Sequence, residues 1–240
     1  IVDSFSCRNN KGTHRALDRF RAFFRKAGRN DTRTCWALKC DIRKFFANID
    51  HEILLGILRG HIDDSGILSL LAEVIGSFHS TRPGIGLPLG NLTSQLLVNI
   101  YMNEFDGLVK HKIRVKYYLR YADDFVFVSP DRGELERLLP EVRAFLRDRL
   151  RLELHPDKVF IESVASGVDF LGWVHFPDHR VLRTATKRRI FKRIKESPTE
   201  ATLNSYLGLL GHGNTRKLRA GVSRAYFLAN DAIPANNPGD

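Results

Sequence analysis

The sequence contains little cysteine and no long apolar segment, and both shortages exclude whole classes of protein. Its three cysteines (Cys7, Cys35 and Cys40) are too few for a disulfide framework, and their spacing is not that of a zinc site. We therefore expect a reducing, cytoplasmic setting. No apolar run is long enough to cross a membrane, and no signal peptide is visible. Because the chain does not begin with methionine, we expect it to be part of a longer parent protein.

Positive charge is what the sequence has in excess. It carries 38 Lys and Arg residues against 27 Asp and Glu residues, for a net charge of +11. The segment from Arg180 to Arg224 alone holds 12 basic residues and only two acidic ones, for a net +10. Nucleic acid is the simplest partner for such a field, although a solvated basic helix has the same composition.

Apolar periodicity and turn residues predict a mixture of helices and strands in one large domain or two small ones. The sequence contains neither a nucleophile elbow nor a phosphate-binding P-loop. We expect helices over 14–27, 52–59, 67–78, 91–110, 186–195 and 199–210, another helix after the capping box at 131–134, and strands over 36–41, 115–121, 125–128, 159–162 and 170–176.

Three carboxylates occupy the ends of predicted apolar strands. Asp41 ends the strand 36–41, and Asp123 with Asp124 forms the tip of a hairpin. An Asp-Asp pair at a turn is ordinary on its own, since Asp favours turns. If the two strands lie side by side, however, the three carboxylates converge and repel one another unless cations are present. Hard oxygen ligands of this kind suit Mg²⁺, so the pattern favours a two-metal site.

The hairpin resembles the YxDD motif of reverse transcriptases, since Tyr121-Ala122-Asp123-Asp124 stands between two apolar strands. The segment 39–51 is similar to the first acidic motif of the same family. The resemblance implies an α+β polymerase palm in which Asp41, Asp123 and Asp124 are catalytic. With Ile42, they would hold two Mg²⁺ ions, for which Mn²⁺ can substitute.

Further motifs imply where the incoming nucleotide would lie. Phe46 falls at the family's steric gate against a ribose 2′-OH, although either Phe45 or Phe46 can be core packing. The segment 86–95 resembles the third motif and implies contacts from Leu89, Gly90 and Gln95; the alternative is a loop and helix cap without a ligand. Arg8 lies in a segment similar to the one before the first acidic motif. It could reach template or nucleotide, or be an ordinary exposed arginine.

Later segments imply the leaving-group and duplex contacts. Lys158, in a segment resembling the next motif, is a candidate general acid for pyrophosphate, with a plain surface lysine as the alternative. Residues 169–173 are similar to the primer-grip hairpin, although their apolar residues can be core; the implied grip residues are Phe170, Leu171 and Gly172. Residues 204–215 resemble the thumb of the family. The expected nucleic-acid contacts are Lys187, Arg188, Arg189, Lys192, Arg193, Arg216 and Lys217.

These motifs divide the chain into partial fingers (1–34), a palm (35–176), a basic helical thumb (177–230) and a flexible tail (231–240). The family's earlier finger strands, whose basic residues hold the triphosphate, are missing from the sequence. Together the motifs predict an enzyme that adds dNTPs to a DNA or RNA primer on an RNA template, without a membrane partner.

The form of the third motif indicates a subgroup. Leu89 replaces the Gln of many reverse transcriptases, and 90–95 resembles the enzymes of bacterial and phage diversity-generating retroelements. That resemblance implies errors opposite template adenine and a small basic accessory protein. The alternatives are a retron or group II intron enzyme, a catalytically silent nucleic-acid-binding palm, and an RNA-making polymerase, which Phe46 disfavours.

Overall fold

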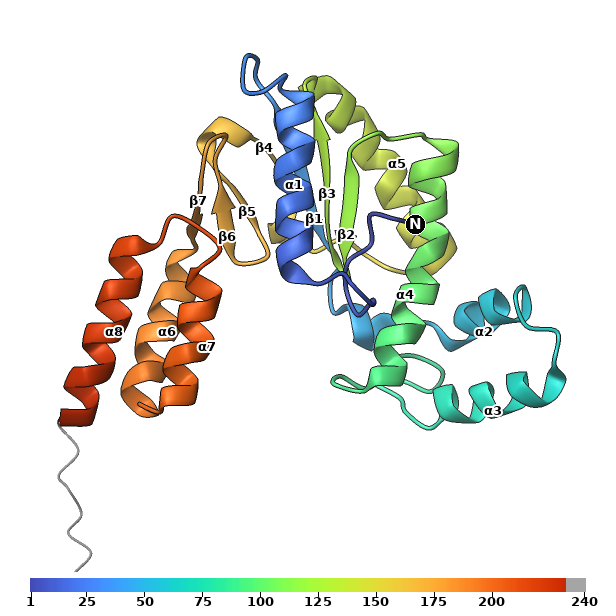
Figure 1. Ribbon diagram of the computed structural model, residues 1–240. Helices are drawn as coiled ribbons and strands as arrows, with labels where there is room; N and C mark the ends of the chain where they lie inside the picture. The colour runs from blue at the N-terminus through green and yellow to red at the C-terminus, as the bar shows by residue number, and fades with distance from the viewer. Residues whose placement is uncertain (232–240) are drawn as a thin grey trace, which may run out of the picture. The chain divides into compact units, whose positions relative to one another are not determined.

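The computed structural model describes residues 1–231; residues 232–240 lie outside the described part. The chain forms two compact units, the first from Ile1 to Ala165 and the second from Ser166 onward. Each unit has its own sheet and helices and is described by itself (Figure 1). The predicted flexible tail, 231–240, falls outside the described residues except for Asp231, which ends the last helix.

The first unit is built on a four-stranded antiparallel sheet with strand order β2-β3-β1-β4. The prediction for the central strand is confirmed, because β1 runs from Trp36 to Asp41. Its register with β3 begins with Trp36 opposite Ser129 and ends with Asp41 opposite Asp124. The other strands are β2 (Tyr118–Tyr121), β3 (Asp124–Ser129) and β4 (Phe160–Ser163).

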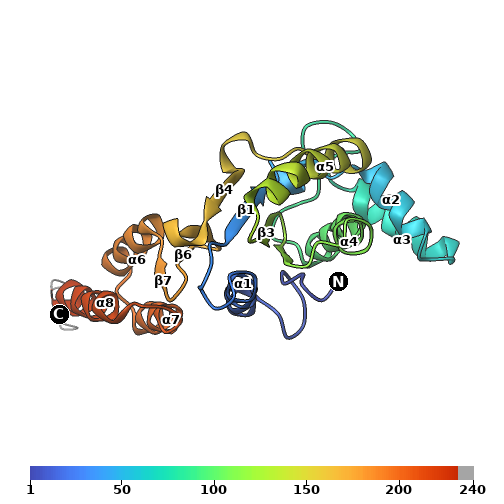
Figure 2. The same cartoon turned by 90° about the horizontal axis from the view of Figure 1, so that it is seen from above.

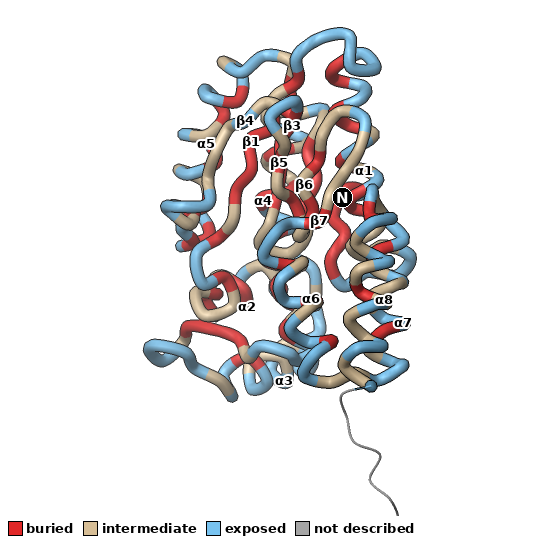
Figure 3. Tube along the Cα trace, turned by 90° about the vertical axis from the view of Figure 1, so that its left-hand side faces the viewer, coloured by how far each residue is buried: buried red, intermediate tan, exposed pale blue. Residues whose placement is uncertain are grey.

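Helices cover both faces of this sheet. Helix α1 (Thr13–Ala27) lies on one face, and α4 (Leu92–Gly107) and α5 (Arg132–Leu150) lie on the other (Figure 2). Most residues of β1, β2 and β3 are therefore buried, while the outer faces of the helices are exposed (Figure 3). The main core lies between the sheet and α4 and α5, where the rings of Phe105 and Phe125 pack 5.1 Å apart.

Side-chain caps explain where several helices begin. Helix α2 (His51–Arg59) follows Asp50, and α3 (Ser65–Gly76) follows Asp64, each aspartate accepting from the backbone N–H three residues later. Asn91 caps α4 by accepting from the N–H of Thr93, as the sequence predicts. The predicted extension of α4 to Lys110 is altered, because the helix continues into a π-helical turn, η2 (Leu108–Lys112).

Asp131 starts α5, but the predicted capping box is not formed. The Asp131 carboxylate accepts from the N–H of Gly133. Glu134 accepts instead from the Ser129 hydroxyl, and that hydroxyl accepts from the N–H of Asp131. Ser129, which is not part of the capping-box motif, therefore links Glu134 to the N–H of Asp131.

As far as it is described, to Asp231, the second unit contains a three-stranded antiparallel sheet, β5-β6-β7, and three helices. The prediction of one strand over 170–176 was wrong: β5 (Val168–Phe170) and β6 (Trp173–His175) form a hairpin that turns at Leu171 and Gly172, both with positive φ. Two elements were not predicted, β7 (Arg180–Leu182) and α8 (Arg216–Asp231).

Helices α6 (Thr184–Glu196) and α7 (Glu200–Leu210) confirm the two predicted basic-segment helices. Thr199 caps α7 by accepting from the N–H of Thr202, and Pro198 lies before this cap. Among residues 1–231, no helix is both long and apolar enough to cross a membrane.

Candidate active site

The carboxylates of the first unit meet at the end of the β1–β3 pair. Asp41 lies directly opposite Asp124 in the antiparallel register, so both side chains point to the same face of the sheet. Asp123 occupies the turn between β2 and β3, and its carbonyl accepts from the N–H of Ile42 at 3.2 Å. The turn places Ala122 in the left-handed region, with φ of 56°. The hairpin thus brings Asp123 and Asp124 to the strand end that carries Asp41.

Two lysines neutralise part of this negative charge. The Lys158 Nζ lies 3.2 Å from each carboxylate oxygen of Asp41. Lys158 belongs to a short 3₁₀ turn, η3 (Pro156–Lys158), which is tied to the strand because the N–H of His155 donates to the Asp41 carbonyl at 2.7 Å. Lys39, on the same face of β1, lies 3.6 Å from Asp124. Lys158 and Lys39 therefore place positive charge beside Asp41 and Asp124, respectively.

Asp123 is a carboxylate whose pKa is shifted by its surroundings. Burial raises its pKa above the ordinary value, and the negative charge of Asp41 raises it further. The positive charges of Lys158 and Lys39 act in the opposite direction. The negative charges of Asp41 and Asp123 therefore act on one another, which favours a bound cation.

The donor set can be tested for its fit to magnesium. Among the described residues, no three His, Cys, Asp or Glu side chains are gathered as a ready ligand shell, so the expected convergence of all three carboxylates is only partial. The charge of Asp41 acts on Asp123, and Asp124 pairs with Lys39 at 3.6 Å. Two carboxylates with water completing the shell are a usual Mg²⁺ arrangement, so the residues fit this ion. Ile42 could add only its backbone carbonyl.

Phe45 and Phe46 have different surroundings. Phe45 is fully within the core, whereas Phe46 is half-buried and packs edge-on against it with ring centres 5.5 Å apart. Both belong to the 3₁₀ turn η1 (Phe45–Asn48), which lies within the first acidic motif, after Asp41. Phe45 is therefore the packing residue of the pair, and Phe46 has the partial exposure that a residue in contact with a ligand needs.

The glycine-rich loop 84–90 runs beside the same turn. The N–H of Leu87 donates to the Phe46 carbonyl at 2.8 Å, and the N–H of Gly86 donates to the Ile49 carbonyl at 2.7 Å. Beyond these bonds the loop turns outward, and Leu89 is 79% exposed. Gly90 adopts a φ of 82° in open space. The structure therefore places the predicted gate and the predicted nucleotide loop side by side.

Gln95 and Arg8 make contacts within the protein. The Gln95 side chain accepts from the thiol of Cys7 at 2.9 Å. The guanidinium of Arg8 donates to the carbonyls of Ile1 and Ser4, which favours the alternative of an ordinary loop arginine over a template contact. The predicted roles of both residues in nucleotide binding stay predictions.

In the second unit, the predicted primer-grip residues form the β5–β6 hairpin. Phe170 is fully buried in the core of that unit, while Leu171 and Gly172 form the turn. The expected duplex-contacting residues are on α6 and α8, where nearly all are exposed. Lys192 is within 3.6 Å of Glu196, and Lys187 is half-buried. A basic helical surface is therefore present as predicted.

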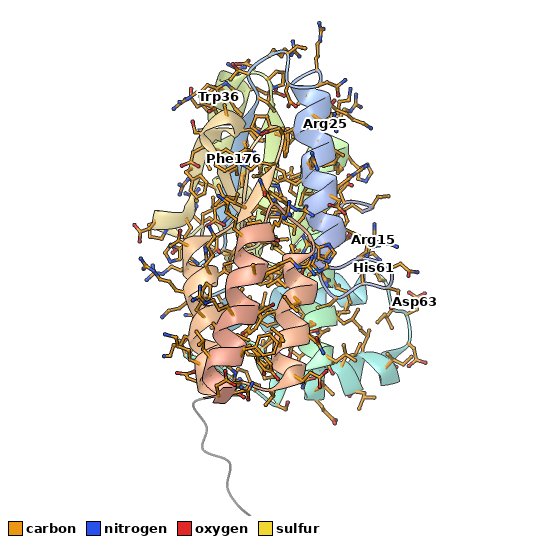
Figure 4. All side chains as sticks on the ribbon, turned by 60° about the vertical axis from the view of Figure 1, so that its left-hand side comes forward. Arg15, Arg25, Trp36, His61, Asp63 and Phe176 are labelled. Atoms are coloured by element: carbon orange, nitrogen blue, oxygen red, sulfur yellow. The ribbon has the colours of Figure 1, made fainter. Side chains whose placement is uncertain are left out.

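A second basic surface was missed. Residues 11–33 hold eight Lys and Arg residues against two aspartates. Arg15 and Arg25 extend outward from α1 (Figure 4). The apolar periodicity of this helix predicts only its buried face. The basic residues on the opposite face were the signal in the sequence for this second surface. The exposed members on and after α1 are Arg15, Arg21, Arg25, Lys26, Arg29 and Arg33.

Comparison with known proteins gives a family match over most of the chain. Residues 2–175 match the family model described as reverse transcriptase (RNA-dependent DNA polymerase). Protein YkfC of Escherichia coli is 26% identical, over 84% of this chain and 60% of that protein. The group II intron-encoded protein LtrA of Lactococcus lactis is 25% identical, over 73% of this chain and 39% of LtrA. The chain thus spans 60% or less of the length of these relatives.

Solved structures share the fold at low sequence identity. Apo telomerase from Candida tropicalis aligns with a TM-score of 0.60 at 12% identity, over 96% of this chain and 46% of that chain. Telomerase from Candida albicans in complex with a TWJ fragment of telomeric RNA gives a TM-score of 0.60 at 11% identity, over 96% of this chain and 45% of that chain. These likenesses confirm the α+β palm fold.

Proposed function

Since this chain belongs to the reverse transcriptase family, we propose that it is the catalytic part of an RNA-directed DNA polymerase. The reaction is attack of a primer 3′-OH on the α-phosphate of a dNTP paired to an RNA template. The observation that carries the proposal is the register of β1 and β3, which sets Asp41 opposite Asp124 and next to the turn that holds Asp123.

Each carboxylate has a role that its surroundings support. Bound at Asp41 and Asp123, two Mg²⁺ ions would lower the pKa of the 3′-OH and neutralise the leaving pyrophosphate. Asp124, paired with Lys39, flanks that pair and keeps the local charge negative. The Ile42 N–H, by bonding the Asp123 carbonyl, orients the turn toward β1.

Lys158 can serve as the acid for the leaving group. Its ammonium sits on Asp41, so a cation bound by that carboxylate would displace it toward the nucleotide. Its side chain is 49% exposed, which leaves room for this movement. A proton donated from Nζ to pyrophosphate would help bond breakage.

Other residues would contact the nucleotide and the duplex. Phe46 would exclude the 2′-OH of a ribonucleotide, while Leu89, Gly90 and Gln95 would lie near the new base pair. The turn of the β5–β6 hairpin would hold the primer, and the basic residues of α6 and α8 would contact phosphates without reading sequence. No base-specific contact is needed, because the template supplies the sequence.

We propose a diversity-generating retroelement as the source, on the basis of Leu89 and the 90–95 motif. In that case a small basic accessory protein would be a partner. A group II intron enzyme is the second candidate, because LtrA is an intron-encoded relative. Replacement of Leu89 by Gln separates the two: a fall in errors opposite template adenine supports the first, and an error spectrum equal to that of the unaltered protein contradicts it.

Primer extension on an RNA template with dNTPs and Mg²⁺ tests the polymerase itself. The Asp123→Asn variant should lose extension by about 10²-fold or more, because it removes a charge that stabilises the transition state. Asp157→Asn, which changes an exposed aspartate of η3, is the matched control and should keep activity.

Binding of a labelled template–primer is measured in parallel. Strong binding with no extension by the unaltered protein would contradict the polymerase proposal and favour a silent binding module. Extension with rNTPs in place of dNTPs would contradict the gate assigned to Phe46.

A further inference from the structure

We propose that Arg120 is a positioning residue that holds the catalytic turn in place, with Asp106 as its buried counter-ion. Arg120 precedes the motif Tyr121–Asp124 by one residue and does not reach the reacting atoms. The inference rests on the proposed function, because it concerns the turn that presents Asp123.

The Arg120 guanidinium connects the turn to helix α4. Its Nε and Nη2 donate to the two carboxylate oxygens of Asp106 at 2.9 and 2.7 Å. Its Nη1 donates to the side-chain oxygen of Asn99 at 3.2 Å and to the Ala122 carbonyl at 3.1 Å. The planar group thus reaches two residues of α4 and one residue of the turn at the same time.

The turn needs such a restraint because its backbone is strained. Ala122 has a φ of 56°, a left-handed conformation that costs a non-glycine residue about 1 kcal/mol or more. Such conformations persist only when surrounding contacts over-determine them. The bond from Arg120 to the Ala122 carbonyl acts on the strained residue itself, directly before Asp123.

Hydrogen bonds hold the backbone of Arg120 at both its N–H and its carbonyl. Its backbone N–H donates to the Asp3 carbonyl, and its carbonyl accepts from the Phe5 N–H, both at 2.9 Å. The N-terminal segment therefore adds a short parallel bridge, from Ser4 to Arg120, at the edge of β2. Arg120 is held by neighbours at its backbone and by Asp106 at its tip, so it can transmit rigidity to the turn.

A buried ion pair is not explained by stability alone. Arg120 and Asp106 are each only 1% exposed, and Asp106 also accepts from the Tyr118 hydroxyl at 2.7 Å. Apolar residues of similar volume often replace such pairs with no loss of stability. What they cannot replace is a donor aimed at the Ala122 carbonyl, and this is the property that assigns the pair a positioning role.

The test removes the polar cluster while keeping its volume. The triple variant Asp106→Leu, Tyr118→Phe, Arg120→Met makes these three side chains apolar and keeps Asn99. Tyr118→Phe alone is the control, because it removes a partner of Asp106 and keeps the guanidinium. Amide exchange of the peptide 120–125 is compared with that of β1 in the same sample, together with kcat, the KM for dNTP and the Kd for template–primer.

The triple variant should exchange faster at 120–125 but not at β1. Its kcat should fall about 10–100-fold, as for other residues that orient metal-binding groups, with Kd unchanged. Exchange and kcat equal to those of the control would overturn the proposal. If the triple variant does not fold, Arg120→Lys, which keeps the charge but not the fork, decides by the same two readouts. If the unaltered protein does not extend primers, amide exchange at 120–125 still tests whether Arg120 holds the turn in place.

Discussion

Asp123 keeps a carboxylate in a place that disfavours its charge. Burial and the neighbouring Asp41 raise its pKa, so the folded protein binds a proton there more readily than the unfolded chain does. The charged form of Asp123 therefore lowers stability, and that loss is present above its folded pKa and relieved as the pH falls below it. A metal site gains from the same arrangement, because a cation relieves the repulsion.

We predict that Asp123→Asn stabilises the metal-free protein at neutral pH while abolishing primer extension. Thermal unfolding in EDTA should show a higher midpoint for the variant at pH 7, and the difference should shrink as the pH falls through the range where Asp123 takes up a proton. A midpoint difference that stays constant from pH 7 to pH 4 would contradict this reading of Asp123.

At the residue scale, the sequence predicts the catalytic candidates but not their supports. Asp41, Asp123 and Asp124 stand at the ends of apolar strands, a local pattern that can be read from spacing. The pairing of Arg120 with Asp106 could not be predicted. The two residues belong to different elements, and the predicted strand 115–121 does not reveal that Arg120 is buried.

At the scale of elements, the glycine-rich loop contains three glycines with positive φ, of which Gly86 and Gly90 have different surroundings. A Cβ on Gly86 would lie 2.6 Å from the Ser80 side chain, whereas a Cβ on Gly90 would meet nothing within 4 Å. The φ values are 101° and 82°. The loop is therefore packed against Ser80 at Gly86 and open at Gly90.

We predict that Gly86→Ala destabilises the protein more than Gly90→Ala does. Both substitutions carry the backbone cost of a positive φ, about 1 kcal/mol, and Gly86→Ala adds a steric clash worth about 1–3 kcal/mol. Urea unfolding curves give the two free energies. Equal losses for the two variants would mean that the Ser80 contact is not a restraint on the loop.

Strongly patterned elements could be predicted from the sequence, and short ones could not. The bounds of β1 and the start of α4 follow from an apolar run and from the cap at Asn91. The strands β5, β6 and β7 have three residues each, which is too short for a period to show. Helix α8 was not predicted, and Val222 is its buried residue.

At the scale of the whole molecule, the basic excess should dominate binding to nucleic acid. Each phosphate contact releases condensed counter-ions, so affinity should fall steeply with salt. We predict that replacing Lys187, Arg188 and Arg189 by Gln lowers the slope of log K against log salt by about 1 per residue that contacts phosphate. Replacing the exposed Arg137 and Arg147 of α5 is the control and should leave the slope unchanged; equal effects would place the duplex elsewhere.

Because the chain divides into two compact units, we expect each unit to have its own free energy of unfolding. Trp173, in the core of the second unit, lies against Gly213, where a Cβ would be 2.1 Å from the indole ring. We predict that Gly213→Ala destabilises the second unit by about 1–3 kcal/mol. Trp173 fluorescence in a Trp36→Phe background measures this change, and exchange at β1 should be unaffected.

Gly221→Ala is the control for that experiment, since a Cβ there makes an ordinary 3.5 Å contact and alanine favours the helix. A simultaneous shift of both units would show that they unfold as one. The sequence predicts a palm-to-thumb change at 176–177, whereas the compact units divide after Ala165; the functional division into fingers, palm and thumb stays a prediction.

The thiols described above make the protein a convenient subject for optical work. Burial raises the pKa of Cys35 to about 12 and that of Cys40 further still, while Cys7 is exposed. Because thiolates are the reactive form, a maleimide dye should attach once to the native chain and three times after denaturation, which mass spectrometry can count. The dye would sit beside Gln95, so its colour or brightness could follow nucleotide arrival without any engineered label site.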